Sequence, residues 1–117
     1  MLTEPSVEIV KYSVTAAEPE LIGDINMLPY TLTVEQRGPN SWAIIWIGRD
    51  LDVNGKWDNA PLPSSRSDEW LSTHRFTLDR ALAIAKAIAP TLTCNGSTIE
   101  DTEQWYAKLP ESVRNGA

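Results

Sequence analysis

The 117-residue chain has one cysteine, one histidine and no long uninterrupted apolar run. A single cysteine cannot form an internal disulfide, and free cysteine is typical of a reducing compartment. No segment approaches the ~18 consecutive apolar residues of a membrane span. The first residues lack the basic and apolar regions of a signal peptide. We therefore expect a soluble, cytoplasmic protein with no membrane association.

Basic residues are also scarce. Ten Lys and Arg stand against sixteen Asp and Glu, which gives a net charge of −6. Binding to a phosphate backbone needs clustered Lys and Arg, so nucleic-acid binding by a β-sheet domain is only an alternative function. The acidic surplus favours solubility, or it steers the protein toward a basic partner.

Catalytic and metal motifs are sparse as well. His74 would have to pair with Cys94 or with a serine of residues 64–67 to make a nucleophile and base, and the spacing does not support either pair. One Cys and one His are too few for the four ligands of a zinc site, so we expect no zinc. We therefore expect no enzyme activity, no catalytic residue and no cofactor.

The residues that are present predict one domain, 1–117, of the α+β class. We expect a small antiparallel sheet of three or four strands in a β-β-β-α core, with one long helix on one face and a shorter C-terminal helix. The predicted parts are an N-terminal strand and loop (1–29), the core (30–89), the C-terminal helix (97–109) and a frayed tail (110–117).

Individual elements follow from local patterns. The apolar run 42–47 predicts a strand buried on both sides and reaching about Leu51, and Asn54-Gly55 predicts a hairpin. Alternating residues predict a strand at 30–37. Further strands are expected at 7–14 and 70–76, and a loop at 15–29. Apolar residues at helical spacing after the N-cap Thr77 predict a helix at 78–89. A capping box from Ser97 to Glu100 predicts the helix at 98–109.

The polar loop 58–69 is long for a compact domain, and such loops often carry function. On the predicted strands, Trp42, Trp46, Trp70 and Phe76 share one sheet face, as core or as an exposed aromatic patch. The function we expect is a non-enzymatic protein-interaction module, with homodimerisation through the uncovered sheet face as a variant. The predicted partner-binding residues are Trp57, Ser65, Arg66, Asp68 and Trp70.

A weak calcium-binding module is the other alternative. Residues 50–58 match the start of a calcium loop, with glycine at the sixth position. The twelfth position, which should supply a bidentate glutamate, is Pro61. The candidate calcium ligands are Asp50, Asp52, Asn54 and Asp58.

Residues 42–89 also contain a distinctive set of ordered pieces: Trp42, Asn54-Gly55-Lys56-Trp57, Pro61-Leu62-Pro63-Ser64-Ser65-Arg66, Trp70 and Arg75-Phe76-Thr77-Leu78-Asp79-Arg80-Ala81-Leu82. This part of the chain resembles small uncharacterised proteins encoded by actinobacterial phages and their hosts. The resemblance implies a phage-type accessory protein in the host cytoplasm and implies no particular activity. The β-β-β-α order is also similar to integrase arm-binding domains, which bind DNA through a basic sheet.

Overall fold

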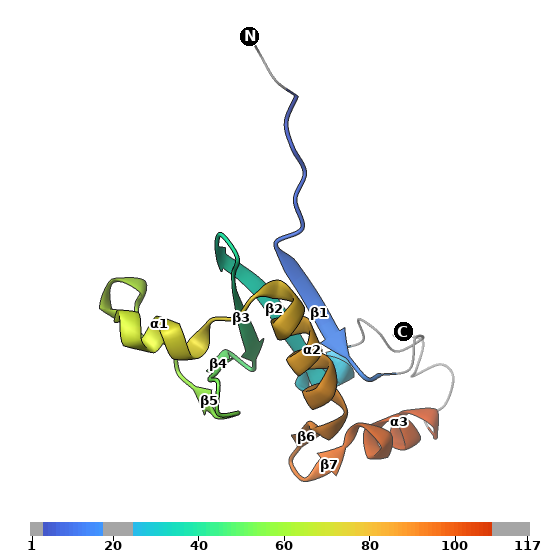
Figure 1. Ribbon diagram of the computed structural model, residues 1–117. Coiled ribbons are helices and arrows are strands. Elements are labelled where there is room, and N and C mark those ends of the chain that lie inside the picture. The colour runs from blue at the N-terminus through green and yellow to red at the C-terminus, as the bar shows by residue number, and fades with distance from the viewer. Residues whose placement is uncertain (1–3, 18–24, 109–117) are drawn as a thin grey trace.

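The computed structural model describes residues 4–17 and 25–108 (Figure 1). The main sheet contains β1 (Lys11–Thr15), β2 (Thr31–Gly38), β3 (Ser41–Trp46), β4 (Arg49–Leu51) and β5 (Trp57–Asp58), each antiparallel to the next. The helices are α1 (Asp68–His74), α2 (Leu78–Ile88) and α3 (Ile99–Ala107). Short 3-10 turns are η2 (Ile25–Tyr30), η3 (Pro63–Ser65) and η4 (Ala89–Thr91), and β6 (Thr93–Cys94) pairs with β7 (Ser97–Thr98). The α+β class is confirmed, with more strands than predicted.

The core lies between the sheet and α2. In β2 the predicted alternation is confirmed: Leu32 and Val34 are fully buried, whereas Thr31 and Thr33 are half-buried. The register places Val34 between Tyr12 of β1 and Ile44 of β3, so these side chains share one face of the sheet. Because antiparallel sheets tolerate a polar second face, the opposite side of β1 and β2 needs no helix. It carries Lys11, Ser13, Thr15, Thr31, Thr33 and Glu35.

The predicted helix at 78–89 is confirmed as α2, one residue shorter. Thr77 Oγ1 accepts a hydrogen bond from the backbone N–H of Arg80, and α2 ends just before η4. Ala81, Ala85 and Ala89 are buried against the sheet. Small side chains at this spacing let the helix backbone lie close to β2 and β3.

The single strand predicted from 42 to 51 is wrong, because the chain reverses at Ile47-Gly48. Both residues have positive φ, 47° and 73°, and Trp46 pairs with Arg49 across the turn. Two positive φ values define the turn type that joins tightly twisted antiparallel strands. The apolar run therefore ends in a hairpin, and Ile47 is 66% exposed.

The strand predicted at 70–76 is also wrong, because residues 68–74 form α1. Ser67 Oγ accepts a hydrogen bond from the backbone N–H of Trp70, and two acidic residues occupy the first turn, where the helix dipole favours them. Only Phe76 joins the sheet, through two backbone bonds of 2.8 and 2.9 Å with Trp42. Trp70 consequently does not share a sheet face with Trp42 and Trp46.

The chain termini differ from the sequence predictions in detail. The strand expected at 7–14 begins only at Lys11, although the Val10 carbonyl oxygen still accepts a hydrogen bond from the Gln36 N–H. Residues 4–9 run away from the sheet (Figure 1). The loop expected at 15–29 contains the start of η2. The capping box of α3 lies one residue later than expected, between Thr98 and Asp101. The predicted tail 110–117 lies outside the described residues.

Within 4–17 and 25–108, no helix has the length and apolar content needed to cross a membrane.

Candidate functional site

The β4–β5 hairpin holds one carboxylate in a fixed position. Asp52 Oδ1 accepts hydrogen bonds from the backbone N–H groups of Asn54 (2.9 Å) and Lys56 (2.8 Å). The Lys56 bond is the main reason that the pKa of Asp52 lies below its ordinary value of 3.8. Gly55, with φ of 85°, completes the turn, so the predicted Asn54-Gly55 hairpin is confirmed. The aspartate is therefore anchored by one oxygen and keeps its negative charge.

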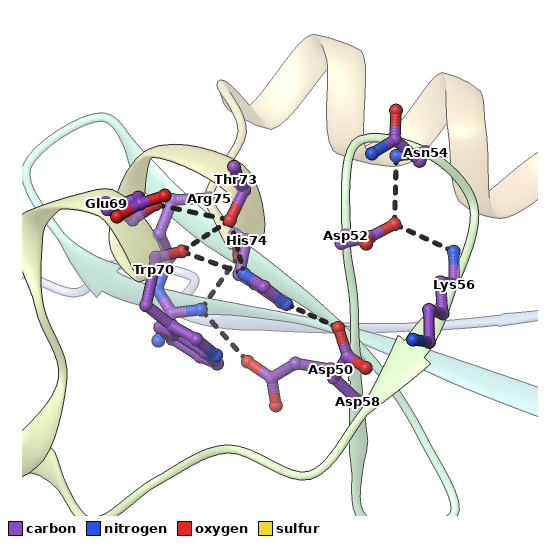
Figure 2. A network of polar contacts seen from close by, with 10 residues as sticks. All are labelled: Asp50, Asp52, Asn54, Lys56, Asp58, Glu69, Trp70, Thr73, His74 and Arg75. Carbon is purple, nitrogen blue, oxygen red and sulfur yellow. Dashed lines mark hydrogen bonds and ion pairs between the residues drawn. The ribbon is translucent and has the colours of Figure 1, made fainter.

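His74, the last residue of α1, faces this hairpin and is only 5% exposed. Its Nε2 lies 2.9 Å from Asp58 Oδ2, and its Nδ1 lies 2.8 Å from the carbonyl oxygen of Trp70 (Figure 2). The ring stacks on the Trp70 indole, with centroids 4.2 Å apart. Contacts on both nitrogens and one ring face hold the imidazole in a single orientation.

Asp52, Asp58 and His74 form one cluster. One oxygen of each carboxylate and one imidazole nitrogen all lie within 4.8 Å of one another. Figure 2 shows the aspartates on the hairpin and the histidine reaching them from α1. Nitrogen and carboxylate oxygen are metal-ligand types, so this cluster is a candidate site for a single ion.

A buried ion pair lies beside this cluster. Arg75 Nη1 donates to Asp50 Oδ2 at 2.9 Å, and both side chains are only 8% exposed. The same nitrogen donates to the His74 carbonyl oxygen at 2.8 Å. Burial lowers the pKa of Arg75 below its ordinary value, and the hydrogen bond and charge of Asp50 oppose that shift. Asp50 therefore stabilises a guanidinium that is largely removed from water.

On the other side of Arg75 opens a cavity of about 490 Å³. Three arginines from different segments line it: Arg37 at the end of β2, Arg66 before α1 and Arg75 after it. The remaining lining residues are Ser41, Pro63, Asp68, Leu71 and Ser72. The positive charges of Arg66 and Arg37 contribute to lowering the pKa of Arg75, so the three groups interact electrostatically.

The Trp70 indole supports two of these arginines. The guanidinium carbons of Arg66 and Arg75 lie 5.4 and 5.0 Å from the ring centroid. Arg66 Nε donates to the Pro61 carbonyl oxygen at 2.9 Å. Arg37 is 3.4 Å from Glu35. Within the described residues, no carboxylate pairs with Arg66, so its charge is the least compensated in the cavity.

The structure places the predicted partner-binding residues in two regions. Arg66 and Asp68 line the cavity, Trp70 supports it, and Ser65 is exposed nearby in η3. Trp57 lies elsewhere and packs on Trp46, with ring centroids 5.5 Å apart.

Of the predicted calcium ligands, Asp52 and Asp58 place carboxylate oxygens in the cluster, and Asp50 lies opposite Asp58 across the β4–β5 pair. Asp50 pairs with Arg75 instead, and Asn54 contributes its backbone N–H to the turn. Sequence reasoning missed His74 as part of this cluster. The sequence feature that could have pointed to His74 is that it is the only histidine in the chain.

Comparisons of the chain with family models, curated proteins and solved structures gave no significant match. The function must therefore be argued from the geometry of the cavity and the cluster. The resemblance of residues 42–89 to phage-type proteins stays a prediction.

Proposed function

We propose that the protein is a non-enzymatic interaction module that binds an acidic segment of a protein partner in the arginine-lined cavity. The observation that carries the proposal is the convergence of Arg37, Arg66 and Arg75 in a chain with a net charge of −6. Asp50 and Glu35 already compensate Arg75 and Arg37, whereas Arg66 has no paired carboxylate among the described residues, and its charge beside the other two is unfavourable without compensation. A carboxylate in the cavity would supply that compensation.

The cavity offers the chemistry that recognises a carboxylate side chain. Guanidinium groups donate two parallel hydrogen bonds to a carboxylate, and stacking on an aromatic ring orients them before binding. Arg66 and Arg75 both lie against Trp70, so part of the entropic cost of ordering them is met before binding. The hydroxyl groups of Ser41 and Ser72 add neutral donors at the wall. About 490 Å³ is enough for one or two acidic side chains.

Arg66 is the residue on which partner binding should depend most. Arg75 is already paired with Asp50, and Arg37 lies close to Glu35. Among the described residues, Arg66 is held by a carbonyl oxygen and the indole, which leaves its terminal nitrogens for a partner's carboxylate. Asp68 also lines the cavity. Its negative charge repels an anion unless that anion bonds directly to a guanidinium group.

The test measures binding of a fluorescent hexaglutamate peptide by anisotropy at low salt. We expect the wild type to bind, and Arg66→Gln to bind at least tenfold more weakly. The matched control is Arg49→Gln, because Arg49 is exposed on β4 and lies outside the cavity. Its affinity should equal that of the wild type, and added salt should weaken binding throughout. Equal affinity of all three proteins, or no binding at low salt, would contradict the proposal.

Two further arms distinguish the source of the anion. A single-stranded oligonucleotide of equal charge is tested in competition with the peptide. If it binds more tightly and its binding depends on Arg66, nucleic-acid binding replaces the proposed function. Sedimentation of wild type and Arg66→Gln tests the homodimer variant, in which a second copy supplies the acidic segment. A dimer that Arg66→Gln dissociates would identify the partner as the protein itself.

A further inference from the structure

We infer that Asp52, Asp58 and His74 form a binding site for a divalent transition-metal ion of the Zn²⁺ type. The inference is independent of the arginine-lined cavity and of its proposed partner. It rests on the hydrogen-bonding roles that the two imidazole nitrogens of His74 must take, and on the charge of the two aspartates.

The position of the Nδ1 proton follows from its neighbours. Nδ1 lies 2.8 Å from the Trp70 carbonyl oxygen, which can only accept a hydrogen bond. The Thr73 hydroxyl, also 2.8 Å away, directs its own proton to the Trp70 and Glu69 carbonyl oxygens, so it too can accept from Nδ1. Nδ1 is therefore the protonated nitrogen of His74.

The Nε2 lone pair of a neutral His74 then points at Asp58 Oδ2, 2.9 Å away, which is also an acceptor. Two acceptors at this distance repel each other unless a cation lies between them. A proton on Nε2 would provide one positive charge. The second carboxylate, Asp52, would then share that single charge with Asp58, and Lys56 and two backbone N–H groups also act on it. A divalent ion neutralises both aspartates.

The surroundings of His74 also match those of a metal-binding histidine. Ligating imidazoles commonly donate their second nitrogen to a backbone carbonyl, which fixes the tautomer and aims the free nitrogen. The stack on Trp70 and the burial of the ring restrict it further. Asp52 is likewise held through Oδ1, and no described residue bonds its Oδ2. The ligands are thus largely positioned before the ion arrives.

The ligand set selects the class of metal. Imidazole nitrogen favours Zn²⁺, Ni²⁺ or Co²⁺ over Ca²⁺ and Mg²⁺, which prefer oxygen ligands alone. Tetrahedral metal–ligand bonds of about 2.1 Å place two ligand atoms roughly 3.4 Å apart. Nε2 and Asp58 Oδ2, now 2.9 Å apart, would separate by about half an ångström to admit the ion. Three protein ligands leave further coordination positions for water or for a group from another molecule.

The decisive experiment uses the single histidine of the chain as its probe. Tag-free full-length protein is freed of metal with EDTA, and Zn²⁺ is titrated in while long-range ¹H–¹⁵N spectra report both imidazole nitrogens. We expect Nδ1 to stay protonated and the Nε2 resonance to shift with one equivalent of Zn²⁺. Calorimetry of the same titration should give a 1:1 complex.

Two variants test whether Zn²⁺ binding depends on this cluster or only on the acidic surface of the protein. Asp52→Asn keeps the oxygen that accepts from Asn54 and Lys56 but loses the charge, so the hairpin is preserved, and we expect at least tenfold weaker Zn²⁺ binding. Glu69→Gln, an exposed acid on α1, is the control and should bind like the wild type. Asp58→Asn serves as a second ligand variant if Asp52→Asn shows an altered circular dichroism spectrum.

Three results would overturn the inference. The first is an Nε2 resonance unchanged in millimolar Zn²⁺, which would show that His74 and Asp58 are a simple ion pair. The second is undiminished Zn²⁺ affinity in a folded ligand variant. The third is tighter binding of Ca²⁺ than of Zn²⁺ with no effect on the imidazole, which would return the site to the calcium module predicted from residues 50–58.

Discussion

Ile47 is the position where a substitution should stabilise the protein. It lies in the two-residue turn between β3 and β4 with φ of 47°, followed by Gly48 with φ of 73°. A left-handed conformation brings the Cβ of an L-residue close to the following carbonyl oxygen, and a β-branched side chain makes this worse. The side chain is 66% exposed, so it gains little from packing in return. Replacing it with asparagine, which tolerates this conformation, should relieve the strain.

The size of the gain follows from these two facts. The left-handed region costs an ordinary L-residue about 1–2 kcal/mol, and asparagine before glycine is favoured in this turn type. Loss of a mostly exposed isoleucine removes a few tenths of a kcal/mol of residual packing, on the order of 25 cal/mol per Å². Ile47→Asn should therefore raise the free energy of unfolding by about 1 kcal/mol. For a domain of this size that corresponds to a rise in Tm of roughly 4 °C.

The assay is urea unfolding followed by tryptophan fluorescence, with Tm from circular dichroism. Ile47→Val is the matched control, because it keeps the branched Cβ and should leave stability unchanged. Ile47→Gly should gain less than Ile47→Asn, since glycine also increases the freedom of the unfolded chain. If Ile47→Asn is no more stable than Ile47→Val, the turn is not strained and the reasoning is refuted.

Three further predictions use the same unfolding measurements. Asp50→Asn should lower the free energy of unfolding by about 3–5 kcal/mol, because the buried Arg75 guanidinium loses its counter-charge. Adding Arg75→Met to this variant should recover most of the lost stability. If it recovers none, the unpaired charge is not the cause of the loss. Thr77→Ala should cost about 1 kcal/mol through the lost α2 N-cap, whereas Thr77→Ser should be nearly neutral. Tyr30→Phe should cost about 1 kcal/mol, because the buried hydroxyl bonds the Ser97 carbonyl and Thr102; an unchanged Tm would show that these bonds do not anchor α3.

The elements that were predicted correctly are those specified by neighbouring residues. In α2, the N-cap Thr77 and the spacing of Ala81 and Ala85 both act within the helix itself. In β2, alternation with period two sets which side chains face the core. The Asn54-Gly55 turn is equally local. Each of these signals is strong before any tertiary contact forms.

Residues 68–76 show where local reading fails. The segment has the alternation of a strand, with Trp70, Ser72, His74 and Phe76 on one side. The N-cap Ser67 and the acidic residues after it favour a helix instead. The helix prevails because its end is tied to the hairpin, by the Thr73 carbonyl to the Val53 N–H and by His74 to Asp58. These partners are distant in sequence, so the pattern within the segment could not decide between the two states.

The candidate sites were visible only in part for the same reason. Loop composition identified Arg66 and Asp68, but Arg37 looked like the polar end of a strand. Its place in the cavity depends on the β2–β3 register, which shifts between Gln36 and Gly38. The calcium-like spacing identified Asp52 and Asp58. The nitrogen ligand was missed because it is supplied by α1, a helix that the sequence did not predict.

The short helix α1 connects the two candidate sites. A helix of seven residues has too few internal hydrogen bonds to be stable alone, so its position depends on contacts made at its ends. Those contacts are polar: His74 with Asp58, and the following Arg75 with Asp50. Trp70 stacks on His74 and also supports Arg66, the least compensated charge of the cavity. The hairpin aspartates therefore help to position Arg66 and Arg75, although they do not line the cavity themselves.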